Sequence, residues 1–88
     1  MKERKIQILN RLGLHARPAA MLVSKATKFK SRILAIKDEM EVDCKSILGV
    51  MMLAAQVGSW VILRVDGPDE EEALVEISKL FEEKFGEQ

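Results

Sequence analysis

The pattern of apolar and polar positions along the chain predicts several short β-strands. Residues 5–9, KIQIL, alternate in polarity, and residues 32–37 and 41–43, RILAIK and EVD, resemble two further short strands. A short polar turn at Asp38-Glu39 separates the last two stretches, which favours an antiparallel hairpin. Residues 59–65, SWVILRV, are the most strand-like run, because they are rich in β-branched and aromatic side chains. The pattern therefore predicts four strands.

A helix is predicted to begin near Ala16, after the residues from Asn10 to Gly13 interrupt the first strand. Pro18 fits only in the first turn of that helix, because its missing N–H would have no intrahelical acceptor there. Small and apolar residues recur at helical spacing on one face, and polar residues lie opposite them. The apolar face holds Ala16, Ala19, Ala20, Val23 and Ala26, and the polar face holds Ser24, Lys25 and Lys28.

Two further helices are predicted downstream. Ser46 precedes ILGVMMLAA, a short and almost wholly apolar helix. The last helix begins at Asp69 with an acidic first turn, which suits the positive helix end, and it stops near Gly86. Its apolar stripe consists of Ala73, Leu74, Ile77, Leu80, Phe81 and Phe85.

The order of these elements is β-α-β-β-α-β-α. Each helix is apolar on one side, and the strands are too short and too mixed in polarity to be covered on both faces. We therefore expect an α+β fold, a βαββαβα open-faced sandwich with three helices on one face of a four-stranded antiparallel sheet. The 88 residues contain no repeat, linker or low-complexity tract, so a single domain over residues 1–88 is predicted.

The charge of the chain is balanced overall but divided between its halves. The 14 basic and 14 acidic residues give a net charge near zero, so there is no general attraction to nucleic acid or membrane. Residues 1–37 hold ten basic side chains and one acid, whereas residues 38–88 hold four and thirteen, which favours a field that orients partners. Aromatic residues make up only 5% of the chain, so a stacking platform for nucleic-acid bases is not expected.

Cysteine content is compatible with a reducing compartment, and hydropathy predicts neither export nor membrane insertion. Cys44 is the single cysteine, so no internal disulfide can form, and we interpret it as a packing residue. No apolar run approaches the roughly 20 residues needed to cross a bilayer, and the first residues lack an apolar stretch of signal length. We expect a soluble, cytoplasmic monomer that does not insert into membranes.

The sole histidine, His15, lies at the predicted start of the first helix. Unpaired backbone N–H groups and the positive end of the helix dipole attract anions there, and the same field keeps a ring nitrogen free for nucleophilic attack. Arg17 adds a planar cation that can hold phosphoryl oxygens. Pro18 stiffens the turn, Gly13 permits a phosphoryl group to approach the backbone closely, and Ala16 is the first residue of the helix. These three residues would therefore support a phosphate-binding loop.

The same residues also fit a purely structural role, with a capping histidine, a helix-starting proline and a solvated arginine. Local physics leaves both interpretations open. An autonomous kinase or hydrolase is disfavoured, because we find no glycine-rich nucleotide loop, no metal-ligand cluster and no carboxylate near His15 that could activate water. We therefore predict no cofactor and no metal, and partner enzymes would supply turnover.

Three segments resemble the signature blocks of HPr, the histidine-containing phosphocarrier family of the phosphoenolpyruvate-dependent sugar phosphotransferase system. They read GLHARPAA at 13–20, KSILGVM at 45–51 and GPDEEEAL at 67–74, and their spacing matches along nearly the whole chain. The resemblance implies the same open-faced sandwich. It also implies that enzyme I phosphorylates His15 on Nδ1, that Arg17 steadies the phosphoryl group, and that the IIA component of a sugar permease then receives it.

Ser46 has two interpretations. Its place before Ile47 makes it a natural N-cap of the second helix. The resemblance adds that an HPr kinase/phosphorylase modifies the matching serine in some bacteria, after which the protein accepts phosphate poorly and binds a catabolite-control transcription regulator. A phosphate is favourable at a helix N-terminus, and its charge would repel acidic partners.

The short apolar helix is also a candidate docking surface. One side of it is expected to face solvent, and an exposed apolar patch beside a reactive residue is typical of a partner site. Basic side chains at its rim, Arg17 among them, would attract acidic partners. The other predicted docking residues are Ala20, Lys25, Lys28, Ile47, Leu48 and Met51.

Two alternatives stand beside the sugar phosphocarrier. The chain can be a regulatory HPr-like binding module that works through Ser46, or the carrier of a parallel nitrogen-related phosphorelay. The hairpin at residues 38–40 also lacks the glycine that the family commonly has there, which leaves the geometry of its turn open.

Overall fold

The computed structural model describes residues 1–87, which form four strands, three α-helices and one short 3-10 turn. The strands are β1 (Lys2–Gln7), β2 (Arg32–Lys37), β3 (Met40–Asp43) and β4 (Trp60–Asp66). The helices are α1 (Ala16–Ala26), α2 (Ile47–Met52) and α3 (Glu70–Glu82), followed by the 3-10 turn η1 (Lys84–Gly86). Within residues 1–87, none of the helices combines the length and the apolar character that crossing a bilayer requires.

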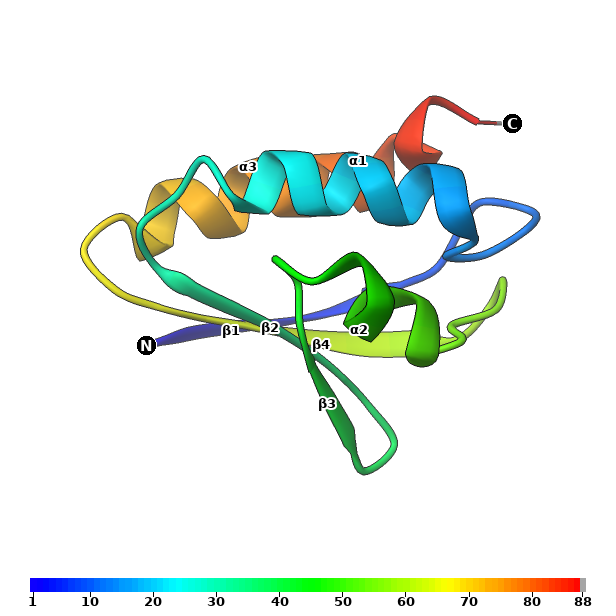
Figure 1. Cartoon of the computed structure of the whole chain (residues 1–88), viewed down its shortest axis with the longest axis horizontal. Helices are drawn as coiled ribbons and strands as arrows, with labels where there is room; N and C mark the ends of the chain where they lie inside the picture. The colour runs from blue at the N-terminus through cyan, green and yellow to red at the C-terminus, as the bar shows by residue number, and fades with distance from the viewer. Residues whose placement is uncertain (88) are drawn as a thin grey trace.

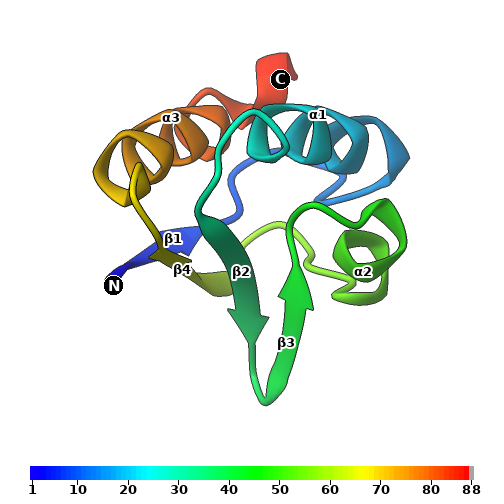
Figure 2. The same cartoon turned by 60° about the vertical axis from the view of Figure 1, so that its left-hand side comes forward.

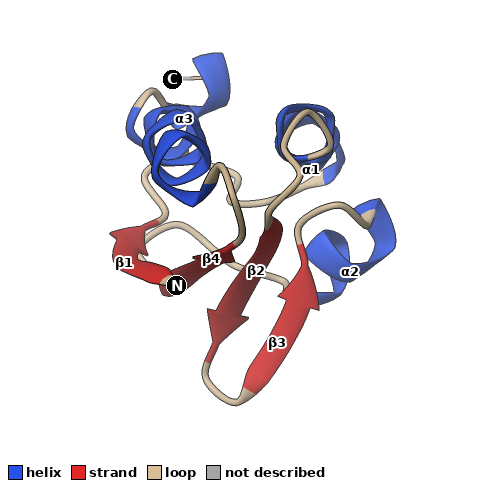
Figure 3. Ribbon diagram, turned by 90° about the vertical axis from the view of Figure 1, so that its left-hand side faces the viewer, coloured by secondary structure: helices blue, strands red, loops and turns tan. Residues whose placement is uncertain are grey.

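The predicted α+β open-faced sandwich is confirmed. The strands form one antiparallel sheet in the order β1-β4-β2-β3. The three α-helices lie on one face of the sheet, with α1 beside α3 and α2 next to β3 (Figure 1, Figure 3). Figure 2 shows that the opposite face of the sheet is left uncovered.

Strand β4 illustrates how the sequence builds two different faces. Its alternate residues Val61, Leu63 and Val65 are fully buried under the helices, whereas the residues between them are more exposed on the open face. Cys44 belongs to the same core, as expected of a packing residue, and burial raises the pKa of its thiol to about 12. The core therefore lies between the sheet and the helix layer.

The apolar face of α1 differs from the prediction. The buried residues of this helix are Pro18, Ala19, Leu22 and Ala26, whereas Ala16 and Ala20 are exposed. Leu22 is completely buried, and its large side chain sets which face packs on the sheet. Alanine is a weak guide to helix orientation, because its small side chain has little area to bury on either face.

The last helix is shorter than its apolar stripe suggested. It ends at Glu82 instead of running to Gly86, and the chain turns through η1, where Lys84 and Phe85 both have positive φ. Phe85 is nevertheless buried, and its ring meets that of Phe81 edge to face, 4.9 Å between centroids. Of the predicted apolar stripe, Ala73, Ile77, Phe81 and Phe85 are buried and Leu74 and Leu80 are partly buried, but the prediction joined two backbone segments into one helix.

The bounds of the first strand need correction, and the turn geometry of the predicted hairpin is now defined. The first strand runs from Lys2 to Gln7 instead of from 5 to 9, because it pairs with β4 along its charged amino end. The hairpin between β2 and β3 has no glycine, and Asp38 takes the left-handed conformation with φ 56°. Aspartate tolerates this region better than most residues, because its short polar side chain can bond locally.

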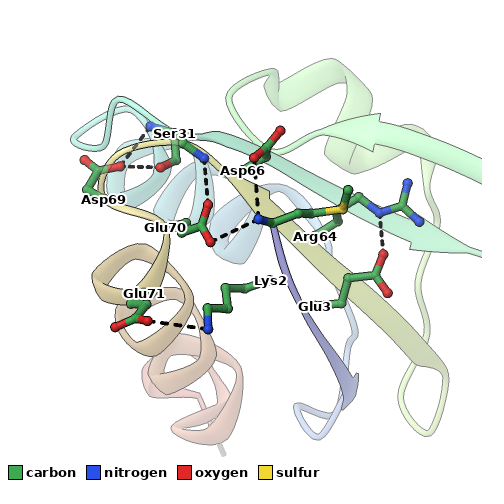
Figure 4. A network of polar contacts seen from close by, with 10 residues as sticks. Lys2, Glu3, Ser31, Arg64, Asp66, Asp69, Glu70 and Glu71 are labelled. Atoms are coloured by element: carbon green, nitrogen blue, oxygen red, sulfur yellow. Dashed lines mark hydrogen bonds and ion pairs between the residues drawn. The ribbon is translucent and has the colours of Figure 1, made fainter.

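The acidic start of α3 is tied to the neighbouring loop and to β1. Asp69 does not cap its own helix; its carboxylate accepts hydrogen bonds from the Ser31 hydroxyl and from the N–H groups of Lys30 and Ser31. Figure 4 shows this cluster beside the ion pair between Lys2 and Glu71. The hydrogen bond from Ser31, together with the N–H of Lys30, lowers the pKa of Asp69 to about 2.

The lowered pKa of Asp69 predicts how the stability of the fold depends on pH. An unfolded aspartate titrates near 3.8, so the Asp69 bonds contribute stability that is present above that pH and is lost as pH falls toward about 2. Asp69→Asn is expected to lower the Tm at pH 7, and the gap to the parent protein should narrow below about pH 4. Thermal unfolding between pH 2.5 and pH 7 measures this difference in Tm. The control is Glu72→Gln, which changes an exposed carboxylate on the same turn. A gap that is equally wide at pH 2.5 and pH 7 contradicts the assignment.

Candidate functional site

His15 is the N-cap residue of α1, as predicted. Its backbone is extended, with φ −77° and ψ −173°, and its carbonyl accepts the hydrogen bond from the N–H of Ala19 at 3.0 Å. The imidazole makes no capping bond to the helix, and 35% of the side chain is exposed. The ring is therefore free of a capping role and accessible to a partner.

The loop before His15 is held by backbone bonds that require a glycine. Gly13 has φ +68°, and its N–H donates to the carbonyl of Asn10 at 3.1 Å. The next residue, Leu14, is buried, and its N–H donates to the carbonyl of Ala55 at 2.9 Å. This hydrogen bond holds the loop after β1 against the segment after α2. The position of the His15 backbone, from which the imidazole extends, is therefore fixed.

A carboxylate lies against the histidine ring. The Glu87 oxygens are 2.9 and 3.1 Å from Nε2 of His15, and Oε1 also accepts a hydrogen bond from the side chain of Asn10. The expectation that no carboxylate lies near His15 is thus wrong. Glu87 is 72 positions away in the chain and follows η1, the turn after α3.

The charge state of Glu87 follows from these contacts. Burial opposes ionisation, but the hydrogen bonds from His15 and Asn10 outweigh it and hold the pKa of the Glu87 carboxyl below its ordinary value. The positive charge of Arg17 acts in the same direction. Glu87 is therefore an anion at neutral pH.

The first turn of α1 has the features of an anion site. Ala16 and Arg17 supply the first two N–H groups of the helix, which have no carbonyl acceptor within it, and Pro18 has no N–H to satisfy. Both Ala16 and Arg17 are exposed, whereas Pro18 and Gly13 are buried. These two N–H groups and the Arg17 guanidinium thus belong to the turn that follows His15.

The predicted docking residues divide into two groups. Ile47, Leu48 and Met51 of α2 are exposed by 45%, 67% and 44%, while Val50 turns into the core. Helix α2 packs against α1, on which Ala20 is exposed, so these side chains belong to adjacent helices (Figure 3). Exposed apolar side chains on a helix that packs against the helix carrying a reactive ring are typical of a partner site.

The two lysines lie further away. Lys25 faces α3, where its Nζ is 3.9 Å from the Glu76 carboxylate. Lys28 follows the carboxyl end of α1, an 11-residue helix and thus about 16 Å long, with His15 at its other end. Among the three predicted rim cations, Arg17 is the one at the same end of α1 as the imidazole.

Ser46 is the N-cap of α2, as predicted, and its hydroxyl accepts a hydrogen bond from the N–H of Gly49 at 3.1 Å. Ser46→Ala is therefore expected to lower the stability by about 1 kcal/mol, because one N–H of the first turn loses its acceptor. This corresponds to a Tm lower by roughly 4–8 °C in a domain of this size, measurable by thermal unfolding.

The matched control is Ser24→Ala, an exposed serine inside α1, where alanine favours the helix and no loss is expected. Equal Tm values for the two variants would contradict the capping role of Ser46.

Sequence reasoning missed two residues of the site, Asn10 and Glu87. Asn10 stands in the same loop as His15 but reads as a simple strand breaker, and its burial comes from tertiary packing. Glu87 has no local signal, because its distance along the chain from His15 can be closed only by the full fold. Chemically, the site combines a nucleophilic ring, free amide donors, a guanidinium and an acceptor for the ring N–H, which suits reversible capture of a phosphoryl group.

Comparison with known proteins agrees with this chemistry. The family model described as "PTS HPr component phosphorylation site" matches residues 2–83. The "Phosphocarrier protein HPr" of Treponema pallidum is 49% identical over 83 residues, which are 94% of each chain. The "HPr-like protein Crh" of Bacillus subtilis is 39% identical over 84 residues, 96% of this chain and 99% of that one.

The fold has close counterparts among solved structures. The crystal structure of HPr-C-His from Thermoanaerobacter tengcongensis matches with a TM-score of 0.96 and 50% identity, covering 100% of this chain and 99% of that one. The similarity therefore extends over the sheet, the helix layer and the loop that carries His15.

Proposed function

Because the chain belongs to the HPr family of phosphocarrier proteins, we propose that it accepts a phosphoryl group on Nδ1 of His15 from phosphorylated enzyme I and donates it to the IIA components of sugar permeases. The observation that carries the proposal is the position of His15. Its ring is partly exposed at the amino end of α1, beside Arg17 and free amide groups, where an incoming phosphoryl group meets both a nucleophile and oxyanion donors.

The transfer step requires only a nucleophile and an anion site. The lone pair on Nδ1 forms a bond to phosphorus while the bond between phosphorus and the donor's leaving atom breaks, and the donor keeps that electron pair. The N–H groups of Ala16 and Arg17 and the Arg17 guanidinium stabilise the phosphoryl oxygens. The reverse step delivers the group to the next protein, so the chain acts as a carrier.

Partner proteins dock on the exposed side of α2 in this proposal. The apolar side chains of Ile47, Leu48 and Met51 supply contact area beside His15, and methionine adapts to more than one partner surface. Arg17 adds attraction for acidic partners, which speeds encounter and leaves the complex weak enough to dissociate.

Ser46 offers a second, regulatory site. It stands at the start of α2, next to the proposed docking residues, and a phosphate there would place a negative charge on that surface. We propose that an HPr kinase/phosphorylase modifies Ser46, that the modified chain accepts phosphate poorly from enzyme I, and that it then binds a catabolite-control regulator. An ATP-dependent, acid-stable phosphate on Ser46 tests this proposal.

A regulatory module and a nitrogen-related phosphorelay carrier differ from the proposed sugar phosphocarrier in their partner proteins. A regulatory module of the kind named HPr-like would work through Ser46 alone, and a nitrogen-related relay would use His15 with a different donor. The accessible ring of His15 favours a carrier over a purely regulatory module.

The proposal is tested by incubating the protein with phosphoenolpyruvate and enzyme I. We expect an acid-labile phosphate that is stable in alkali, as for a phosphohistidine, and that disappears when a IIA protein is added. Enzyme I and IIA from a nitrogen-related relay, used in place of the sugar set, distinguish the two carrier roles. Failure of the wild-type protein to take up phosphate from either set would overturn the carrier proposal.

A further inference from the structure

We propose that Asn10 and Glu87 are positioning residues for the phosphoryl transfer, and that together they determine which ring nitrogen of His15 is free to accept the group. This inference deepens the proposed function and rests on it. The two residues come from distant parts of the chain: Glu87 contacts Nε2 of the ring, and Asn10 donates a hydrogen bond to Glu87.

Asn10 is the fixed point of this arrangement. It is completely buried, and its Nδ2 donates both to the carbonyl of Gly13 at 2.6 Å and to Oε1 of Glu87 at 3.1 Å. Both partners are acceptors, so the amide must turn its NH2 group toward them. The turn before α1 and the carboxylate are thereby held by one side chain.

The remaining atom of this amide supports a functional role. Among the described residues, the buried Oδ1 of Asn10 has no hydrogen-bond partner. An unpaired buried acceptor destabilises a fold, so packing alone does not explain an asparagine at this position. Its NH2 group, by contrast, serves two acceptors at the site.

Glu87 in turn determines the proton on the ring. Because the carboxylate is ionised, it can only accept, and the hydrogen of the neutral imidazole must lie on Nε2, 2.9 Å from Oε2. The lone pair is then on Nδ1. The arrangement has the same logic as a carboxylate that orients a histidine in a catalytic triad.

The contact also favours the transfer itself. When Nδ1 bonds to phosphorus while Nε2 keeps its proton, the ring gains positive charge, and the Nε2–H bond to the Glu87 carboxylate becomes stronger. Glu87 does not compete with the phosphoryl group, because the two ring nitrogens face different directions. Removing it is therefore expected to slow the transfer step more than the binding of enzyme I.

Because the chain has one histidine, labelling that residue with ¹⁵N gives a single set of ring signals for NMR. In the wild-type protein at neutral to mildly alkaline pH, we expect a downfield Nε2–H proton that exchanges slowly with water. Glu87→Ala should broaden the signal of this proton beyond detection. With the variant as the substrate of enzyme I, kcat for phosphoryl transfer should fall about 10-fold, with little change in KM. Glu87→Gln should restore part of the Nε2–H signal and part of kcat, because its amide oxygen still accepts the hydrogen bond from Nε2–H.

The control is Glu83→Ala, an exposed glutamate at the end of α3, which should leave the ring signals and the rate unchanged. A wild-type ring that carries its proton on Nδ1 overturns the proposal. So does a Glu87→Ala protein with an unchanged Nε2–H signal and an unchanged rate. The NMR result is obtained without enzyme I, so it decides the positioning role even where phosphate uptake itself fails.

Asn10→Asp tests the second residue. The new carboxylate would face that of Glu87, and the repulsion should remove the Nε2–H signal although Glu87 is still present. A folded Asn10→Asp protein with wild-type ring signals would overturn the part assigned to Asn10. Where this variant does not fold, Asn10→Ala removes the same donor without adding a charge, and wild-type ring signals in that variant would likewise overturn the part assigned to Asn10.

Discussion

His15→Ala is expected to abolish phosphate uptake from phosphoenolpyruvate and enzyme I and to leave the fold intact. The reason for complete loss is chemical, because alanine offers no lone pair and the other side chains of the site are a guanidinium, an amide and an anion. The fold should survive because the imidazole makes no capping bond and is partly exposed. Acid-labile label on the protein measures the first effect, and thermal unfolding measures the second.

Ser46→Ala is the control for this experiment, since it alters a helix cap on the neighbouring helix and leaves the ring untouched. It should take up the label normally at a temperature well below its Tm. Acid-labile phosphate that persists in His15→Ala would place the acceptor elsewhere and refute the site assigned to the chain.

Gly13→Ala is expected to have the largest effect on stability together with a loss of transfer. A Cβ at this position would lie 2.3 Å from the carbonyl oxygen of Ala55 and 3.0 Å from the Cα of Gln56, and the backbone φ of +68° is itself unfavourable for alanine. Strain and the weakened hydrogen bond from Leu14 should lower the stability by roughly 2–4 kcal/mol. The displaced loop should also slow phosphate uptake about 10-fold or more, because the ring shifts with it.

Gly58→Ala separates the two causes of this loss. Gly58 also has a positive φ, +88°, but a Cβ there would have no described heavy atom within 4 Å. Its expected loss is about 1 kcal/mol, from backbone strain alone. Urea unfolding of both variants gives the comparison, and equal losses would show that contact with the 55–56 segment is unimportant.

The fold could be predicted because its strongest signals are local. The β-branched and aromatic composition of residues 59–65 predicts β4, and in the structure its buried residues Val61, Leu63 and Val65 alternate with residues that face the open side. The errors arose where tertiary contacts determine the orientation or the end of a helix. Leu22, not the alanines, orients α1, and η1 bends the chain between two residues, Phe81 and Phe85, that pack as neighbours.

The site was predictable in the same uneven way. His15, Arg17 and Pro18 lie within four positions and share one helix start, which is compatible with an anion site and equally with a structural cap, and the resemblance to HPr favoured the anion site. Asn10 and Glu87 gave no such signal. A buried asparagine looks like any turn residue in a sequence, and the contact of Glu87 with the ring exists only after α3 has packed on the sheet.

The contact between His15 and Glu87 spans 72 positions, and this has a consequence for how the protein is made. A ribosome produces the histidine early, but the carboxylate is synthesised only after the last helix. A nascent chain therefore exposes the imidazole before its orienting partner exists. The complete transfer site therefore forms only after α3 and η1 have been made, so an interrupted translation product that retains the loop and α1 would have a ring without a fixed proton.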